Sequence, residues 1–408
     1  MDWAPTKKRV RNGCSFLPIS PYTEGIRKME DRIIEKDFGD LAVNMGPQHP
    51  STHGVFRLKL YLQGERINKI ESFLGYLHRG VEKLSEKLTY DQLPPVLERD
   101  DYLSPTSNSL GFINAVEKIC EIEVSRKSSY IRVLVAELQR ISSHLVALGT
   151  YGLDLGGALG GGASLFLYCF REREKILDVM EDLTGTRFHT NMNQIGGVRY
   201  DVKTESINKI RKLVKELRPV LEDYANMISK DEIFMKRTQN IGIISKELAE
   251  ESGGSGPIVR GSGINFDVRK NKPYECYSEF DFNIPLGTNG DAYDRTIVRM
   301  KENIESLRIV EQIIEGIPSG DIHSRKPLKS PKLTRPPKGS SYFSIESPRG
   351  ELGFFIVSDG TAIPYRMKIR APSFSNLSLV EKLLPGTFIA DSVVILGSLD
   401  PVFGDVDR

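Results

Sequence analysis

Two of the chain's six histidines lie four positions apart in the segment Gly46–Gly54, which reads GPQHPSTHG. Imidazole exchanges protons near neutral pH, so His49 and His53 are candidates for proton chemistry. Pro47 and Pro50 fix φ and remove backbone donors, which argues against a helix or a central strand. The segment therefore predicts a rigid loop that delivers two imidazoles to the start of a strand. A tight turn with incidental histidines explains it equally well.

Three further residues are notable for their neighbours. Residues 94–105 read PPVLERDDYLSP, so four charged residues precede Tyr102, and a surface loop is the default interpretation. Asp154 lies between two leucines just beyond a helical pattern. An unpaired buried carboxylate is costly, so we expect Asp154 to have a partner. His144, beside an apolar helical stripe, is expected to be a packed or hydrogen-bonded core residue rather than a ligand.

The segments around these residues show two periodicities. Period-2 alternation predicts strands, and apolar residues three to four positions apart predict helices. Strands are expected at residues 55–62, 67–73, 340–345, 353–357 and 365–370. Helices are expected at residues 24–36, 81–88, 110–122, 130–148, 165–183, 204–238 (in one or two pieces), 291–315 and 388–397. Gly149 and Gly152 are expected to end the helix at 130–148.

These elements indicate an N-terminal extension followed by one large domain. The basic, proline-rich part of that domain could face anionic lipid or an acidic partner, although a solvated linker is the simpler interpretation. The expected divisions are the extension at 1–37 and the domain at 38–408, with a β part at 38–77, a mainly helical part at 78–316, the basic crossing at 317–340, and β structure plus a C-terminal helix at 341–408.

Composition narrows the class of protein. A net charge of +2 over 408 residues argues against a nucleic-acid binder. No apolar run reaches the roughly 18 residues of a membrane-spanning helix, and the N-terminus has no hydrophobic signal region. The four cysteines, Cys14, Cys120, Cys169 and Cys276, include no C-x-x-C pair. This spacing argues against a zinc or iron–sulfur site held by the chain itself, and glycine spacing gives no support for nucleotide binding.

Nine motifs, in order from about residue 40 to the C-terminus, resemble one family, the 49-kDa subunit of respiratory complex I, NADH:quinone oxidoreductase. Together they are far more specific than any one of them alone. They are GPQHPSTHG at 46–54, GYLHRG at 75–80, RDDYLSP at 99–105, LDLG at 153–156, FREREK at 170–175, RGSGINFDVRK at 260–270, SPRGELGFFIVSDG at 347–360, PYRMKIRAPSF at 364–374 and SLDPVFGDVDR at 398–408.

The resemblance implies a fold similar to that of the [NiFe] hydrogenase large subunit. This is an α+β fold in which a central helical bundle carries small β regions near the N- and C-termini. Hydrogenases hold nickel with two Cys-x-x-Cys pairs. The corresponding regions here, 75–80 and 400–405, contain no cysteine. Because nickel needs those thiolates, a hydrogenase activity is excluded, and no metal is expected in this chain.

The resemblance also implies a role. Such a subunit forms one wall of the quinone head-group pocket in a proton-translocating enzyme and is active only within the complex. The other wall belongs to a partner that carries the terminal [4Fe–4S] cluster, and a membrane-arm subunit lies at the quinone entry. The substrate is a quinone, while FMN and the iron–sulfur clusters reside on partner subunits. The implied location is peripheral, on the cytoplasmic side of the inner membrane or the mitochondrial matrix side.

By position, His53 and Tyr102 match the residues that hydrogen-bond the quinone carbonyls, and Asp154 matches the acid paired with that histidine. Quinone reduction takes two electrons and two protons, and negative charge develops on both carbonyl oxygens. An imidazole at one end and a phenol at the other can stabilise that charge and donate protons. The three residue types therefore suit the implied catalytic role.

Four more positions match binding residues of the family. Arg79, Arg99 and His189 match residues that face the partner's cluster, and Val402 matches a residue that lines the pocket. Cationic groups beside a cluster favour its reduced state and raise its potential.

One departure and two alternatives qualify this interpretation. Residues 156–163 read GGALGGGA, a longer and more glycine-rich stretch than the family has after its LDLG motif. The chain could instead be a non-catalytic scaffold with a relict site, although keeping His53, Tyr102 and Asp154 together argues against that. It could also be the same subunit in a related complex that takes electrons from another donor, such as ferredoxin or a deazaflavin.

Overall fold

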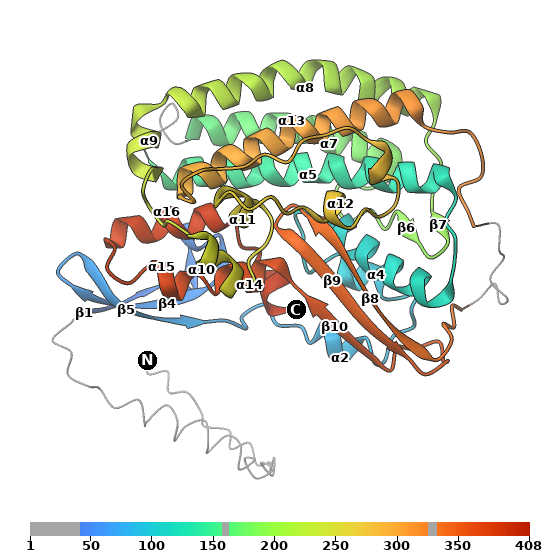
Figure 1. Cartoon of the computed structure of the whole chain (residues 1–408), viewed down its shortest axis with the longest axis horizontal. Helices are drawn as coiled ribbons and strands as arrows, with labels where there is room; N and C mark the ends of the chain where they lie inside the picture. Colours follow the sequence, from blue (N-terminus) through green and yellow to red (C-terminus); the bar gives the residue numbers. More distant parts are fainter. Residues whose placement is uncertain (1–40, 157–162, 325–332) are drawn as a thin grey trace, which may run out of the picture. The chain divides into compact units, whose positions relative to one another are not determined.

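Figure 1 shows the computed structural model, which describes residues 41–156, 163–324 and 333–408. The helix expected at 24–36 lies outside the described residues, as do the extension at 1–37, most of the glycine-rich stretch and part of the basic crossing. Residues 41–408 form one unit of contacts. Helices and small sheets both contribute to it, so the α+β class is confirmed.

Long helices make up the middle of the chain, and their neighbours pack along one another (Figure 1). Each carries apolar residues three to four positions apart, so one stripe of every helix faces the bundle interior. Four predicted helices are confirmed with shifted ends, and the pattern at 204–238 forms two helices. They are α4 (Pro105–Cys120), α5 (Arg126–Asp154), α7 (Ala163–Thr184), α8 (Thr204–Lys230), α9 (Glu232–Thr238) and α13 (Ala292–Gly316).

The prediction that Gly149 and Gly152 end a helix is wrong. Both lie inside α5, which continues to Asp154. A Cβ on Gly149 would lie 3.2 Å from the Cβ of Cys169, and a Cβ on Gly152 would lie 3.1 Å from a methyl of Leu165. The two glycines therefore allow α7 to pack closely on α5. Their role is close approach rather than termination, and this carries α5 on to the acid at its last position.

Two three-stranded antiparallel sheets flank the helices. The first has the order β1–β4–β5, and the second has the order β10–β9–β8. All five predicted strands are confirmed, because period-2 alternation places one face of each sheet in the core. The strands are β1 (Leu41–Met45), β4 (Arg57–Gln63), β5 (Arg66–Phe73), β8 (Gly339–Ser347), β9 (Gly350–Ser358) and β10 (Arg366–Arg370).

Short elements connect these layers. The predicted helix at 81–88 shortens to α2 (Val81–Leu84), and the one at 388–397 becomes α16 (Ile389–Leu399). The remaining elements are β2 (Gln48–His49), η1 (Pro50–Thr52), β3 (Gly54–Val55), α3 (Pro94–Leu97), β6 (Asn193–Gln194), β7 (Gly197–Val198), α10 (Lys246–Glu251), α11 (Pro257–Gly261), α12 (Val268–Asn271), η2 (Tyr277–Glu279), α14 (Pro372–Leu377), α15 (Val380–Leu383) and α17 (Phe403–Asp407). No helix among the described residues is long and apolar enough to cross a bilayer.

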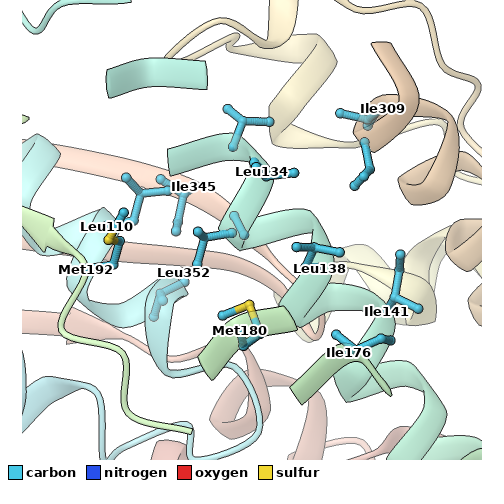
Figure 2. Close-up of a cluster of buried hydrophobic side chains, with 14 of the residues drawn as sticks. Leu110, Leu134, Leu138, Ile141, Ile176, Met180, Met192, Ile309, Ile345 and Leu352 are labelled. Carbon is cyan, nitrogen blue, oxygen red and sulfur yellow. The ribbon is translucent and has the colours of Figure 1, made fainter. Parts of the chain in front are cut away.

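The main core lies between the helices and the second sheet. Figure 2 shows part of it, in which side chains of helices α4, α5, α7 and α13 meet those of strands β8 and β9. The labelled residues are Leu110, Leu134, Leu138, Ile141, Ile176, Met180, Met192, Ile309, Ile345 and Leu352. A second core covers the first sheet, where Phe403 of α17 stacks on Phe56 with ring centroids 5.0 Å apart. The C-terminal helices thus lie against the start of β4.

The bundle also buries charge. His144 is fully buried, and its Nε2 lies 2.9 Å from Oε2 of Glu302 on α13. The prediction of a hydrogen-bonded core histidine is confirmed. Arg260 donates from Nε to the other oxygen of Glu302 at 2.7 Å and from Nη1 to Glu346 at 2.8 Å. The carboxylates in this part of the core are therefore bonded to cations.

Candidate functional site

The loop at 46–54 holds His53 in a fixed position. Residues 50–52 form the 3₁₀ turn η1, and His53 follows it with φ 55°, in the left-handed region. The buried hydroxyl of Thr52 donates a hydrogen bond, with the carbonyl oxygens of His49 at 2.7 Å and Gly54 at 2.8 Å as acceptors. Strands β2 and β3 pair across the same loop. The loop is therefore ordered by its own bonds.

The structure pairs His53 with Asp154, the last residue of α5. Nε2 of His53 and Oδ2 of Asp154 are hydrogen-bonded across 101 residues of sequence. Their side chains remain 9% and 8% exposed. Asp154 thus has the partner that its apolar setting requires. Nδ1 of His53 makes no hydrogen bond with any residue of the described ranges.

Two other elements touch this pair. A Cβ on Gly397 of α16 would lie 3.2 Å from Nε2 of His53 and 3.1 Å from Oδ2 of Asp154. It would also lie 2.7 Å from the ring of Tyr151, one turn before Asp154 on α5. The pair therefore sits where the loop, α5 and α16 meet.

Tyr102 lies in a segment that is largely buried, so the default of a surface loop at 94–105 is wrong. Asp101 beside it pairs with buried Arg349, whose Nη1 lies 3.1 Å from Oδ2 of Asp101. Arg349 comes from the β8–β9 turn, and its Nη2 lies 3.3 Å from Oδ2 of Asp400, just after α16. Its Nη1 also donates to the hydroxyl of Ser143 on α5 at 2.8 Å. Arg349 therefore fastens the segment inward.

The phenol of Tyr102 is half-buried and makes no hydrogen bond within the described residues. Burial raises its pKa, Arg349 opposes the rise, and the carboxylates of Asp101 and Asp400 add to it. Tyr102 makes no direct hydrogen bond to His53 or Asp154. The end of α16 connects the two regions, with Gly397 beside the pair and Asp400 beside Arg349.

The carboxyl of Asp100 is buried and pairs with Arg79. Burial raises the pKa of Asp100 to about 7, against the charge of Arg79. Burial also raises the pKa of Asp405 in α17 to about 6, and the carboxylate of Asp101 adds to that rise. Near neutral pH this region therefore contains protonatable carboxyls.

Arg79, Arg99 and His189 share one neighbourhood. Burial lowers the pKa of His189, and the charges of Arg99 and Arg79 lower it further. Arg99 also donates from Nη1 to the carbonyl of Pro95. The three residues thus form a cationic group beside the segment of Tyr102.

Val402 is buried, and its backbone N–H donates to the hydroxyl of Ser373 at 3.4 Å. A cavity of about 520 Å³ lies elsewhere, lined by residues 123–127, 318–321, 323 and 324. None of the expected site residues lines it.

Sequence reasoning missed the residues that support this site. Arg349, Asp400 and Gly397 lie in or beside matched motifs, yet their roles depend on contacts from α5 and the loop. Composition offered one signal, because glycine is a weak helix former and Gly397 falls inside an apolar helical pattern.

Side chains that bind metals are dispersed. Among residues 41–156, 163–324 and 333–408, no group of three or more His, Cys, Asp or Glu side chains could hold a metal ion. Cys120, Cys169 and Cys276 are free.

Comparison with known proteins supplies an independent finding. The model of the family described as respiratory-chain NADH dehydrogenase, 49 Kd subunit, matches residues 160–408. A subunit of the NADH-quinone oxidoreductase of Desulforamulus reducens is 45% identical over 368 residues, covering 90% of this chain and 98% of the relative. The subunit of the same name in Methylacidiphilum infernorum is 45% identical over 96% of this chain and 98% of the relative. That of Bacillus mycoides is 45% identical over 90% and 98%.

Proposed function

This chain belongs to the family of the 49-kDa subunit of respiratory-chain NADH dehydrogenase, and from that membership we propose that it carries the residues that protonate the quinone. The chain is a subunit of an NADH-quinone oxidoreductase and functions within that complex. The observation that carries the proposal is the hydrogen bond between His53 and Asp154, at the end of a long helix and near the surface.

His53 acts at one end of the quinone. In its imidazolium form Nε2 donates to Asp154, and Nδ1, which has no partner among the described residues, donates to a carbonyl oxygen of the quinone. The carboxylate fixes the orientation of the ring, and the ring gives up a proton as negative charge develops on that oxygen. Asp154 therefore holds the donor in place.

Tyr102 acts at the other end. Its hydroxyl donates to the second carbonyl oxygen, which gains charge as electrons arrive. Arg349 and Asp101 hold the backbone beside it, so the phenol has a fixed origin. The quinone takes up two electrons and two protons, and Tyr102 and His53 each deliver one proton.

The electrons come from a partner subunit. Arg79, Arg99 and His189 face that partner's terminal [4Fe–4S] cluster, and their positive charge favours its reduced state. The described cysteines of this chain are free and far apart in sequence, which fits a cluster held elsewhere. FMN and the other clusters lie on further partners.

The remaining expectations form part of the same proposal. Val402 lines the pocket, and a membrane-arm subunit meets the chain at the quinone entry. The chain lies at the cytoplasmic side of the inner membrane, or the matrix side in a mitochondrion. Its fold is that of the [NiFe] hydrogenase large subunit, with the division at residues 38, 78, 317 and 341 stated above. The complex translocates protons.

The test is quinone turnover by the whole complex carrying His53→Asn or Tyr102→Phe. Both variants should assemble and lose turnover about tenfold or more, while electron transfer to an artificial acceptor that acts before the quinone stays unchanged. His49→Gln is the matched control, because His49 lies on the same loop and its Nδ1 only accepts from the backbone of Ser51. Unchanged turnover in both site variants would favour a scaffold role. Turnover with a donor other than NADH would favour the related complex.

A further inference from the structure

We propose that Gly397 of α16 is a positioning residue for the His53–Asp154 pair. Its missing side chain leaves the space in which imidazole and carboxylate meet. The inference rests on the function proposed above, in which this pair delivers a proton to the quinone.

The geometry is direct. A Cβ at position 397 would lie 3.2 Å from Nε2 of His53 and 3.1 Å from Oδ2 of Asp154, the two atoms that share the hydrogen bond. It would lie 2.7 Å from a ring carbon of Tyr151, closer than Cβ atoms approach other groups in proteins. The backbone of Gly397 therefore forms one wall of the space around the pair.

Backbone conformation does not explain the glycine. Gly397 lies inside α16 with a helical neighbour on each side, and it is not among the glycines with positive φ. Alanine forms helices better than glycine does, so the local structure alone would favour alanine. What excludes a methyl group here is the close approach of His53, Asp154 and Tyr151.

Helix α16 is held in place and cannot retreat from an added methyl. Buried Arg295 of α13 donates from Nη2 to the hydroxyl of Ser398 at 2.8 Å and from Nε at 3.1 Å. Its Nη1 also bonds the carbonyls of Gly242 and Gly290, at 2.9 and 2.8 Å. Residue 398 follows position 397 directly, so this clamp fixes the wall.

Tyr151 is also held. Its ring packs edge-on against Phe234 at a centroid distance of 6.3 Å and is buried. The side chains of His53 and Asp154 keep some exposure and are the part that can move. A methyl at position 397 therefore displaces the imidazole from the carboxylate, and Nδ1 turns away from the quinone oxygen.

The experiment is Gly397→Ala in the whole complex, assayed by steady-state quinone reduction. We expect kcat to fall 10- to 100-fold, because misplacing a reacting group by about 1 Å costs up to about 10²-fold. KM should stay within about twofold, since the quinone's apolar contacts are unchanged. Unchanged kcat in an assembled complex would overturn the proposal.

Gly111→Ala in α4 is the matched control. A Cβ there would lie 2.9 Å from the ring of Phe354, a similar crowding against an aromatic residue, and its other near neighbour is Ile345. This variant should lower the yield of the complex and leave kcat per assembled complex unchanged. An equal loss of kcat in both variants would mean that crowding in general, and not the pair, lowers the rate.

Two further variants settle the remaining outcomes. If Gly397 acts through the pair, adding Gly397→Ala to Asp154→Asn should lower kcat by less than about twofold more, whereas losses that multiply would contradict it. Should Gly397→Ala fail to assemble, Tyr151→Leu removes the closest contact, and the double variant should assemble and keep the loss of kcat. Full turnover in His53→Asn and Asp154→Asn would refute the proposed function itself. Loss there with full turnover in Gly397→Ala would refute only this inference.

Discussion

Two histidine–carboxylate pairs occupy different surroundings in this molecule. His144 and Glu302 lie wholly inside the helical bundle, and Arg260 bonds the second oxygen of Glu302. His53 and Asp154 lie where a loop meets the end of a helix, and both keep some exposure. The chemical groups are alike, so the difference in role must come from what surrounds them.

In the bundle, arginines fix both charges. Burial lowers the pKa of His144, with the charges of Arg140 and Arg299 adding to the effect, so the imidazole stays neutral. Burial alone would raise the pKa of Glu302, but Arg260 and the bond from His144 bring it well below its usual range. By contrast, Asp154 has no ion-pair partner among the described residues except His53. The bundle pair stabilises the fold, and the outer pair is free to exchange a proton.

Breaking the bundle pair should give the largest effect on stability. Glu302→Ala removes the carboxylate that balances Arg260 and His144, and breaking a buried ion pair from one side costs about 3–5 kcal/mol. Thermal or urea unfolding of the full-length chain measures this loss. An effect below about 1 kcal/mol would show that water or other groups replace the carboxylate, and the contrast between the pairs would fail.

Breaking the outer pair should affect rate instead. Asp154→Asn keeps the shape of the side chain but removes its charge, so the imidazole loses the group that orients it. We expect quinone turnover to fall about 10²-fold, the lower end for a lost acid–base group. The free energy of unfolding should change by no more than about 1 kcal/mol, as for partly exposed pairs. Unfolding measured beside turnover separates the two; a stability loss as large as that of Glu302→Ala would place both pairs in the same class.

A smaller effect concerns the buried acids near Tyr102. Asp100 and Asp405 have folded-state pKa values of about 7 and about 6, above the ordinary value near 3.8. A raised folded-state pKa adds stability below the unfolded value and loses it as pH rises through the folded one. Their contribution should decline between about pH 4 and pH 7, by at most about 1.4 kcal/mol per pH unit for each group.

Asp100→Asn cannot ionise and should flatten that decline, which unfolding measured at pH 5 and pH 8 would reveal. Glu302→Gln is the comparison, since the folded-state pKa of Glu302 is lowered and its contribution should persist at pH 8. A steeper decline in Asp100→Asn than in the unaltered chain would reverse the assigned direction.

Much of the fold follows from local pattern. The strands at 55–62 and 353–357 and the helix at 291–315 were predictable because each buries one face against a neighbour. Gly149 and Gly152 were misinterpreted because a glycine late in a helix marks an end as readily as a close helix crossing. Only the position of α7 decides between the two.

The site was predictable in part and for a different reason. The resemblance singled out His53 and Asp154, and their hydrogen bond spans 101 residues, a distance that no local pattern reports. Residues 94–105 were expected at the surface because four charges there suggested solvation. Arg349, which reaches Asp101 from 248 residues away, supplies the countercharge that makes burial possible.

The left-handed backbone of His53 restricts which substitutions position 53 can accept. Asparagine, aspartate and glycine adopt φ near 55° readily, whereas β-branched residues do so at a substantial cost. In a saturation library, valine, isoleucine and threonine should therefore be depleted even when selection acts on assembly alone. Asparagine and glycine should be lost only when selection acts on quinone reduction. Position 53 would then report fold and chemistry through two separate sets of amino acids.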